Sequence, residues 1–302
     1  MKPRVVVLTG PTGIGKSDLA IAVANKWNCE IINGDASQIR KHLNIGTAKP
    51  NISQSLVTQH LFDIINATDS FSIKDYQKKA YEKINEILAK GKIPLIVGGS
   101  GLYIASLFGD YPLNEPTRDP QFAMGFSSLT DKELHELLLE KNPDKAQTIH
   151  PNNRRRVLRA LELTLNPPVF EKIPHETTFE AMIICLTCDR DLIYTRINNR
   201  VESMFNEGWI EEVKQLIDMG MDISQIQEIG YREIKDFLDG KVTIDFVKQL
   251  IKQKTRNYAK RQITWFKNKL ACRFVQMDFK MQEATLKDID ELIACFLNKE
   301  AL

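Results

Sequence analysis

The feature that most constrains the fold is the segment 10–17, "GPTGIGKS", which directly follows the apolar run 4–9, "RVVVLT". It fits the pattern G-x-x-x-x-G-K-[ST], in which backbone N–H groups surround a phosphate. The β-branched run before it predicts a buried strand, and the spacing of "KSDLAIAVANKW" after it predicts a helix. Strand, loop and helix in this order are the context that a phosphate-binding loop, or P-loop, requires.

Within this loop, Lys16 is predicted to reach further phosphate oxygens, and the Ser17 hydroxyl is predicted to bind a magnesium ion. The sequence does not by itself say whether the phosphate is split, transferred or only held. The predicted diphosphate- or nucleotide-binding residues are Gly10, Pro11, Thr12, Gly13, Ile14, Gly15, Lys16 and Ser17.

Further apolar runs alternate with helical patterns along the first third of the chain. "CEIIN" (29–33) predicts a second strand, residues 73–90 predict an amphipathic helix, and "IPLIVGGSGLYIASL" predicts a third strand, a Gly-rich turn and a helix. This β-α-β-α-β-α order predicts an α/β fold with a doubly wound parallel sheet and a site at the carboxyl ends of its strands.

The composition changes at residues 109–122, where three prolines and several polar residues mark a boundary. Helical patterns follow, and Thr130 and Glu133 are spaced as a capping box. "AMIICLTCD" (181–189) then predicts a return to the sheet, and "CRFVQMD" (272–278) predicts its last strand. We therefore expect a P-loop core formed by residues 1–111 and 179–302, with a helical insertion at 112–178.

Composition and cysteine content narrow the class of protein. The 302 residues are 43% hydrophobic and 26% charged, as expected for a folded chain, and no apolar run approaches the roughly 20 residues that span a bilayer. We expect no membrane partner. The five cysteines are scattered, and the lone pair Cys185 and Cys188 lacks the second pair that a zinc site needs, so buried thiols and a cytoplasmic location are expected.

Basic residues are segregated although the net charge is only +2. Residues 246–273 hold nine Lys or Arg and no Asp or Glu, and "NNRRRVLRALE" adds a second cluster. Within the first segment one predicted helix face carries a charge every four residues, which we interpret as a phosphate-binding face. This face consists of Lys248, Lys252, Arg256 and Lys260.

The nearest carboxylate at a strand end is Asp35, after "CEIIN". Because strand ends beside a P-loop point into one cleft, Asp35 is expected to face the group that Lys16 holds. Two interpretations remain open: a magnesium or helix-capping carboxylate, or a general base for an incoming nucleophile. Residues 44–50 are either an anion-contacting loop or a plain surface turn, and His60 and Asp63 are expected to be structural.

The chain resembles tRNA dimethylallyltransferases, also called tRNA isopentenyl-diphosphate transferases, over nearly its whole length. Seven motifs in order carry the resemblance: "GPTGIGKS", "GDASQIRKHLNIGTAKP", "QHLFDI", "VGGSGLYI", "HPNNRRRVLRALE", "EIGYREI" and "RNYAKRQITWF". The C-terminal zinc finger of some eukaryotic members is missing, which indicates the bacterial type.

The resemblance implies transfer of a dimethylallyl group from dimethylallyl diphosphate to N6 of the adenosine just 3′ of the tRNA anticodon, with diphosphate leaving intact. It implies Mg²⁺ as cofactor and tRNA as partner of the insertion, and we expect a monomer. The implied catalytic residues are Asp35, Lys16, Ser100 and Arg232. The implied tRNA-binding residues are Asp35, Ala36, Ser37, Gln38, Ser100, Arg155, Arg156, Val157, Leu158 and Arg159.

The chain departs from the family pattern at several places: Ala36 stands where Ser is common, Arg40 where Tyr is usual, Ser100 where the family has Thr, and Ala123 where many members have Arg. The "TGK" usually found after the Arg-rich helix is replaced by "NPPVFEK". Three alternatives to this activity remain: prenylation of free adenine nucleotides, a P-loop small-molecule kinase, and a non-catalytic tRNA-binding relative. The basic clusters favour a large polyanion over a mononucleotide.

Overall fold

The computed structural model of the chain describes residues 2–108, 119–167 and 179–298. The chain forms two compact units, one of Met1–Tyr111 with Glu176–Leu302 and the other of Pro112–His175. Both ends of the predicted insertion, residues 112 and 178, lie outside the described residues.

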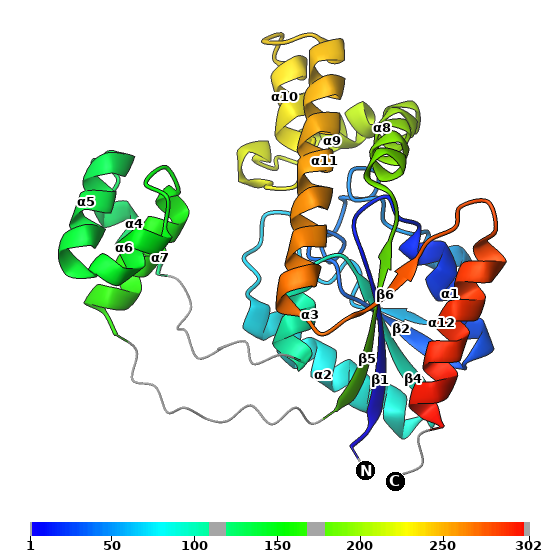
Figure 1. Cartoon of the computed structure of the whole chain (residues 1–302). Helices are drawn as coiled ribbons and strands as arrows, with labels where there is room; N and C mark the ends of the chain where they lie inside the picture. The colour runs from blue at the N-terminus through cyan, green and yellow to red at the C-terminus, as the bar shows by residue number, and fades with distance from the viewer. Residues whose placement is uncertain (1, 109–118, 168–178, 299–302) are drawn as a thin grey trace. The chain divides into compact units, whose positions relative to one another are not determined.

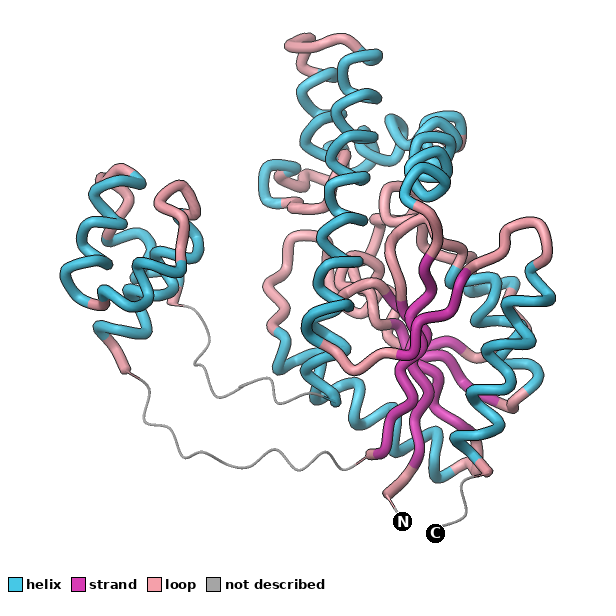
Figure 2. The backbone as a smooth tube through the Cα atoms, in the orientation of Figure 1, coloured by secondary structure: helices cyan, strands magenta, loops and turns pink. Residues whose placement is uncertain are grey.

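The larger unit contains a six-stranded parallel sheet with the strand order β3-β2-β4-β1-β5-β6. The predicted α/β fold with a doubly wound parallel sheet is confirmed, and the five predicted strands are all present (Figure 2). They are β1 (Arg4–Thr9), β2 (Cys29–Asn33), β4 (Ile93–Gly98), β5 (Glu180–Thr187) and β6 (Arg273–Gln276).

The sixth strand, β3 (Gln59–His60), was not predicted. It is two residues long and pairs with β2 at the edge of the sheet. Such a short segment carries no periodic pattern, and only the pairing with β2 makes it a strand.

Helices cover both faces of the sheet (Figure 1). The helices α1 (Lys16–Lys26) and α12 (Gln282–Leu297) pack on one face, and α2 (Ile73–Ala89) and α3 (Gly101–Phe108) on the other. The predicted helix from residue 73 is confirmed: Ser72 and Asp75 form a capping box at its start, and Gly91 adopts φ +69° just past its end.

A group of helices extends beyond the carboxyl ends of the strands (Figure 1). It consists of α8 (Arg190–Asn206), α9 (Trp209–Asp218), α10 (Tyr231–Leu238) and the first half of α11 (Ile244–Lys269), with a short 3-10 turn at Ile223–Gln225. A second 3-10 turn, Ile52–Gln54, lies elsewhere in the larger unit. Its apolar core is built around the fully buried rings of Trp209 and Tyr231. The far half of α11 returns to the sheet, where Phe266 is buried against α2 and α3 side chains.

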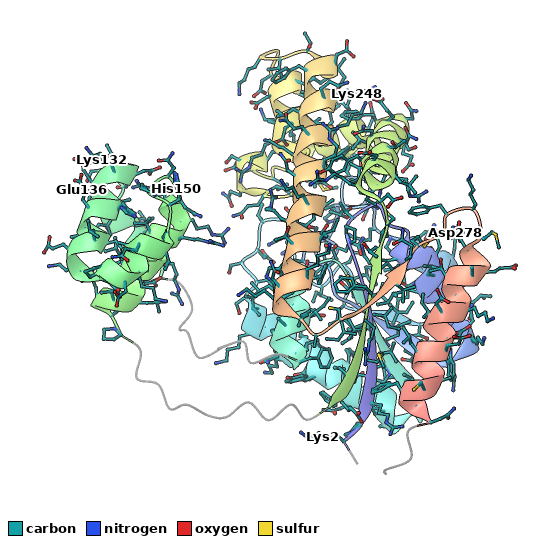
Figure 3. All side chains as sticks on the ribbon, in the orientation of Figure 1. Lys2, Lys132, Glu136, His150, Lys248 and Asp278 are labelled. Carbon is teal, nitrogen blue, oxygen red and sulfur yellow. The ribbon has the colours of Figure 1, made fainter. Side chains whose placement is uncertain are left out.

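The smaller unit contains α4 (Pro120–Gly125), α5 (Asp131–Lys141), α6 (Pro143–Thr148) and α7 (Arg154–Leu165). Leu134, Leu138, Val157 and Leu161 form its buried core. The predicted capping box is confirmed, since Thr130 accepts the Glu133 amide and Glu133 accepts the Thr130 amide. On the exposed side of α5, Lys132 lies one turn from Glu136 (Figure 3). In the part of the chain that the structure describes, no helix combines the length and apolarity needed to cross a bilayer.

Candidate active site

The P-loop connects β1 to α1 and owes its shape to three glycines in positive-φ conformations. Gly10, Gly13 and Gly15 have φ values of +147°, +81° and +90°. A side chain at Gly10 would also meet the Leu186 carbonyl at 2.8 Å. These glycines let the backbone wrap tightly between strand and helix, as a phosphate cradle requires.

The Lys16 ammonium lies over this loop and donates to the carbonyls of Gly10 and Pro11 at 3.0 and 2.8 Å. Burial lowers the pKa of Lys16 from 10.5 to about 8, although the charge of Asp35 acts in the opposite direction. A buried ammonium of this kind is stabilised by an incoming anion. Ser17, the predicted magnesium ligand, is exposed at the first turn of α1.

Asp35 follows β2, and its backbone is fixed from both sides by the buried side chain of Asn33. The Asn33 amide accepts from the Asp35 N–H at 2.9 Å and donates to the Asp35 carbonyl at 3.1 Å. The carboxylate itself accepts only the Ser37 N–H, at 2.9 Å, among the hydrogen bonds found in the described residues. Asp35 therefore has a fixed position and keeps acceptor capacity for a further donor.

The Gly-rich turn after β4 packs directly against the Asp35 segment. The Ser100 hydroxyl accepts the Ala36 N–H at 2.9 Å, and the Ser100 N–H donates to the Gly34 carbonyl at 3.2 Å. A side chain at Gly98 would lie 2.1 Å from the Gly34 backbone, so glycine is required there. The structure thus brings Ser100 and Asp35 together, as predicted.

Gln262 on α11 joins the P-loop to this turn and was not predicted as a site residue. Its side-chain oxygen accepts the Thr12 N–H and its side-chain nitrogen donates to the Gly99 carbonyl, both at 2.8 Å. Tyr258, one turn earlier, is buried beside Ser100, and burial raises the pKa of its hydroxyl, with Asp35 adding to the shift. The i, i+4 spacing of Tyr258 and Gln262 indicates that both lie on one face of α11, but the basic residues on the same helix drew the prediction to another role.

Two arginines of α8 also approach the P-loop and were missed. Arg196 donates to the Gly13 carbonyl at 3.1 Å and stacks over the Phe279 ring at 3.9 Å. Burial lowers the pKa of Arg200, and the charge of Asp35 opposes this shift. Their spacing of four residues on a helix that follows a strand end was the available signal.

These elements enclose a cavity of about 310 Å³. Its lining includes Thr12 of the P-loop, Asp35 and Ser37, the loop residues Gly46 and Thr47, and Arg200, Tyr258 and Arg261. A second cavity, of about 380 Å³, begins at Ser17 and Gln38 and has Ile21, Ile31, Phe62 and Val97 among its apolar walls. The Asp35–Gln38 segment therefore contributes to both cavities.

Arg232, predicted at the diphosphate, is not among the residues that line either cavity. Its side chain is exposed on α10 and donates to the Ile226 carbonyl at 2.8 Å. The structure does not bring it to Lys16, and its catalytic role stays a prediction.

The run Arg155–Arg159 lies on α7 in the smaller unit, and its members face different ways. Arg155 and Arg156 are exposed, whereas Val157 is fully buried and Leu158 packs against the same core. Arg159 forms a largely buried ion pair with Glu162 at 2.7 Å. The exposed surface of this helix is therefore basic, and the apolar members hold it in place.

The expectation that no acidic residue pairs with the predicted phosphate-binding face of α11 is wrong, because three of its four residues contact α8; phosphate binding by this face stays a prediction. Lys248, labelled in Figure 3, and Lys252 form ion pairs with Glu202 of α8 at 2.8 and 2.5 Å. Arg256 donates to Asn198 of the same helix at 2.6 Å. The acidic partner lies more than forty residues earlier in the chain, so the local sequence did not show it. The exposed basic residues farther along α11 include Lys260, the fourth residue of this face, with Arg261 and Lys269, beside Trp265.

His60 and Asp63 have structural partners, as predicted. His60 lies 2.7 Å from the buried carboxylate of Glu30, which also accepts from Lys90 and Lys92. Asp63 forms an ion pair with the buried Lys49 ammonium at 2.5 Å. Arg40, one of the family departures, donates to the carbonyls of Ala67 and Asp69 and pairs with Glu228.

A glycine-rich strand–loop–helix connection, a strand-end carboxylate and cavity-lining arginines of α8 and α11, all near the carboxyl ends of one parallel sheet, are typical of enzymes that act on phosphate-containing substrates. The family model described as IPP transferase matches residues 38–269. A tRNA dimethylallyltransferase of Bacillus velezensis is 43% identical over 97% of both chains, and that of Bacillus subtilis is 44% identical over 91% of both. The chain belongs to the tRNA dimethylallyltransferase family.

Solved structures agree with this assignment. The tRNA isopentenylpyrophosphate transferase of Bacillus halodurans is 36% identical, with a TM-score of 0.73 over 99% of this chain and 98% of that one. A eukaryotic dimethylallyltransferase acting on tRNA is 25% identical, with a TM-score of 0.78 over 99% of this chain and 80% of that one. The chain is thus a transferase of this family, and the similarity covers nearly its full length.

Proposed function

We propose that the protein transfers a dimethylallyl group from dimethylallyl diphosphate to N6 of the adenosine 3′ to the anticodon in tRNA. The observation that carries this proposal is the arrangement of Asp35 between a buried P-loop lysine and a cavity of about 310 Å³. The names of the relatives, which act on tRNA, support the same reaction.

In this reaction the bond from N6 to C1 of the dimethylallyl group forms and the C1–O bond to diphosphate breaks. Diphosphate leaves with the electron pair, so negative charge develops on its bridging oxygen. The P-loop amides, Lys16 and Arg200 are oriented to stabilise that charge, and Arg196 holds the loop itself. No phosphoryl group is transferred. The strand-end carboxylate, Asp35, is therefore assigned to the acceptor amine and not to a phosphate-bound metal.

Asp35 takes the proton that N6 loses. Its carboxylate accepts a single backbone hydrogen bond and is held rigidly by Asn33, so it can accept the amine N–H and remove the proton as the new bond forms. Ser100 fixes the backbone beside it. The target base has to leave the anticodon-loop stack to reach this carboxylate.

A magnesium ion fits the donor set at the P-loop. The exposed Ser17 hydroxyl offers one protein oxygen, and Mg²⁺ binds few protein ligands together with substrate phosphate oxygens and waters. When bound, it supplies charge neutralisation for the leaving diphosphate. We also infer that the exposed Arg155 and Arg156 of α7 contact tRNA phosphates, and that the enzyme is a cytoplasmic monomer.

Mass spectrometry of nucleosides tests the reaction. The protein is incubated with Mg²⁺, dimethylallyl diphosphate and unmodified tRNA, with AMP replacing tRNA in a parallel reaction. Prenylated adenosine is expected only with tRNA, and Asp35→Ala should lower its rate about 10²–10⁴-fold, the usual contribution of a general base. Asp218→Asn, an exposed carboxylate on α9, is the control. Product from AMP alone would instead assign a free-nucleotide prenyltransferase.

A further inference from the structure

The buried carboxylate of Glu212 on α9 is outside every motif that identified the site. It accepts the backbone N–H groups of Asn44 at 2.8 Å, Ile45 at 2.7 Å and Gly46 at 3.2 Å. It also accepts the hydroxyl of the fully buried Tyr231 at 2.8 Å. Four donors occupy all the acceptor sites that an ionised carboxylate has.

The segment that Glu212 holds, residues 44–48, is one wall of the candidate active site. Gly46 and Thr47 line the same cavity as Asp35. The carbonyls of Thr47 and Ala48 accept the side-chain amide of Gln38, both at 3.1 Å. The position of Glu212 therefore fixes the segment that orients Gln38.

The Glu212 contacts reach the acceptor side of the site and do not include the P-loop. All three amides belong to residues 44–46, and the segment's further contacts go to Gln38, three residues after Asp35. The P-loop is held separately, by Gln262 and Arg196. Two sets of contacts thus support the two halves of the cavity.

We propose that Glu212 is a positioning residue for the nucleoside acceptor, acting through residues 44–48 and Gln38. The expected effect on the KM for tRNA rests on the proposed function. Three amides that donate to one buried carboxylate form a firm support, because hydrogen bonds to an ionised acceptor are stronger than those between neutral groups. Loss of the support should disturb acceptor binding and leave donor binding unchanged.

Glu212→Gln tests the proposal, because it replaces one carboxylate oxygen by an NH₂ group. This group cannot accept the backbone N–H groups that the oxygen accepted. The expected result is a KM for tRNA raised at least tenfold, with the KM for dimethylallyl diphosphate within twofold of the original. Glu212→Asp should restore part of the tRNA KM. Glu211→Gln, an exposed neighbour on α9, is the matched control and should change neither constant.

Hydrogen exchange of residues 44–46 gives a readout that does not depend on turnover. Glu212→Gln should speed exchange of these three amides, while the P-loop amides keep their protection. Tyr231→Phe removes one of the four donors and should give a smaller change, which keeps the test available if Glu212→Gln fails to fold. Equal changes in both KM values, or unchanged exchange at 44–46, would overturn the proposal. A wild-type enzyme that does not prenylate tRNA would contradict the proposed function, whereas the exchange result would still decide the role of Glu212 as a support.

Discussion

Gln262 and Thr12 are joined by a hydrogen bond of 2.8 Å between the Gln262 side-chain oxygen and the Thr12 backbone N–H. The same amide group donates to Gly99, so one side chain ties α11 to the P-loop and to the Gly-rich turn. The P-loop and the Gly-rich turn therefore keep their spacing through a helix that begins at Ile244, far from both in sequence.

Replacing Gln262 by alanine should leave the Thr12 N–H and the Gly99 carbonyl without partners. We expect a loss of about 1–3 kcal/mol in the free energy of unfolding, the usual result for an orphaned buried polar group, together with a lower kcat. Urea denaturation and turnover measurements check both. Gln249→Ala, an exposed glutamine on the same helix, should change neither value. Full stability in Gln262→Ala would show that the bridge contributes nothing.

Donor binding should depend on pH through Lys16, whose pKa is lowered to about 8 by burial. Diphosphate itself titrates in this range, so the informative quantity is the ratio of the wild-type affinity for diphosphate to that of Lys16→Arg. Below pH 8 the ammonium is charged and this ratio should be constant. Above pH 8 the free protein loses this charge, so the ratio should fall by about tenfold per pH unit, because each binding event must then recover a proton. Isothermal titration calorimetry from pH 6.5 to 9.5 measures the profile.

Lys16→Arg is the control for that profile, since a guanidinium stays charged throughout the range. Its affinity should be lower and should change with pH only as far as diphosphate itself titrates. The same shift has a stability consequence of opposite direction: between pH 8 and 10.5 the unfolded chain binds more protons at Lys16 than the folded chain does. The unfavourable contribution of this buried lysine to stability therefore shrinks as pH rises. A constant ratio of the two diphosphate affinities up to pH 9.5 would contradict the assignment.

Gly46→Ala should be destabilising because the new methyl group would lie 2.3 Å from Trp209 Nε1. The indole is fully buried and cannot move aside, so an overpacking effect of about 1–3 kcal/mol is expected. Thermal unfolding measures it. Gly125→Ala places the same methyl in open space and should be neutral. Equal melting temperatures for the two variants would mean that residues 44–48 shift freely.

The basic residues near the beginning and near the end of α11 should contribute unequally to tRNA binding. Lys248→Ala with Lys252→Ala removes charges already paired with Glu202, so RNA affinity should change little. Lys260→Ala with Lys269→Ala removes exposed charges beside Trp265 and should weaken binding. If each residue contacts one phosphate, the salt dependence of log K should fall by about 2. Filter binding across a salt series distinguishes the pairs, and a larger loss of affinity in the Lys248 and Lys252 variant would contradict this prediction.

Much of the fold was readable from the sequence because its signals are local. The P-loop, the β-branched runs of β1 and β2 and the capping box at Thr130 each occupy a few consecutive residues. Lys16 and Asp35 were predictable as partners, since the carboxyl ends of parallel strands meet at one edge of the sheet. The resemblance to a known family then predicted the reaction. The spacing of the motif residues alone was compatible with several classes of P-loop enzyme.

The tertiary structure decided the contacts that join distant segments. Gln262 meets Thr12 across 250 residues, Glu212 meets the amides of residues 44–46 across more than 160, and Glu202 neutralises Lys248 and Lys252. No local pattern encodes such pairs, because they arise when helices pack against the strand ends. For the same reason a stripe of charge without local partners in the sequence is ion-paired between α8 and α11, and Gln262 links the two loops of the site.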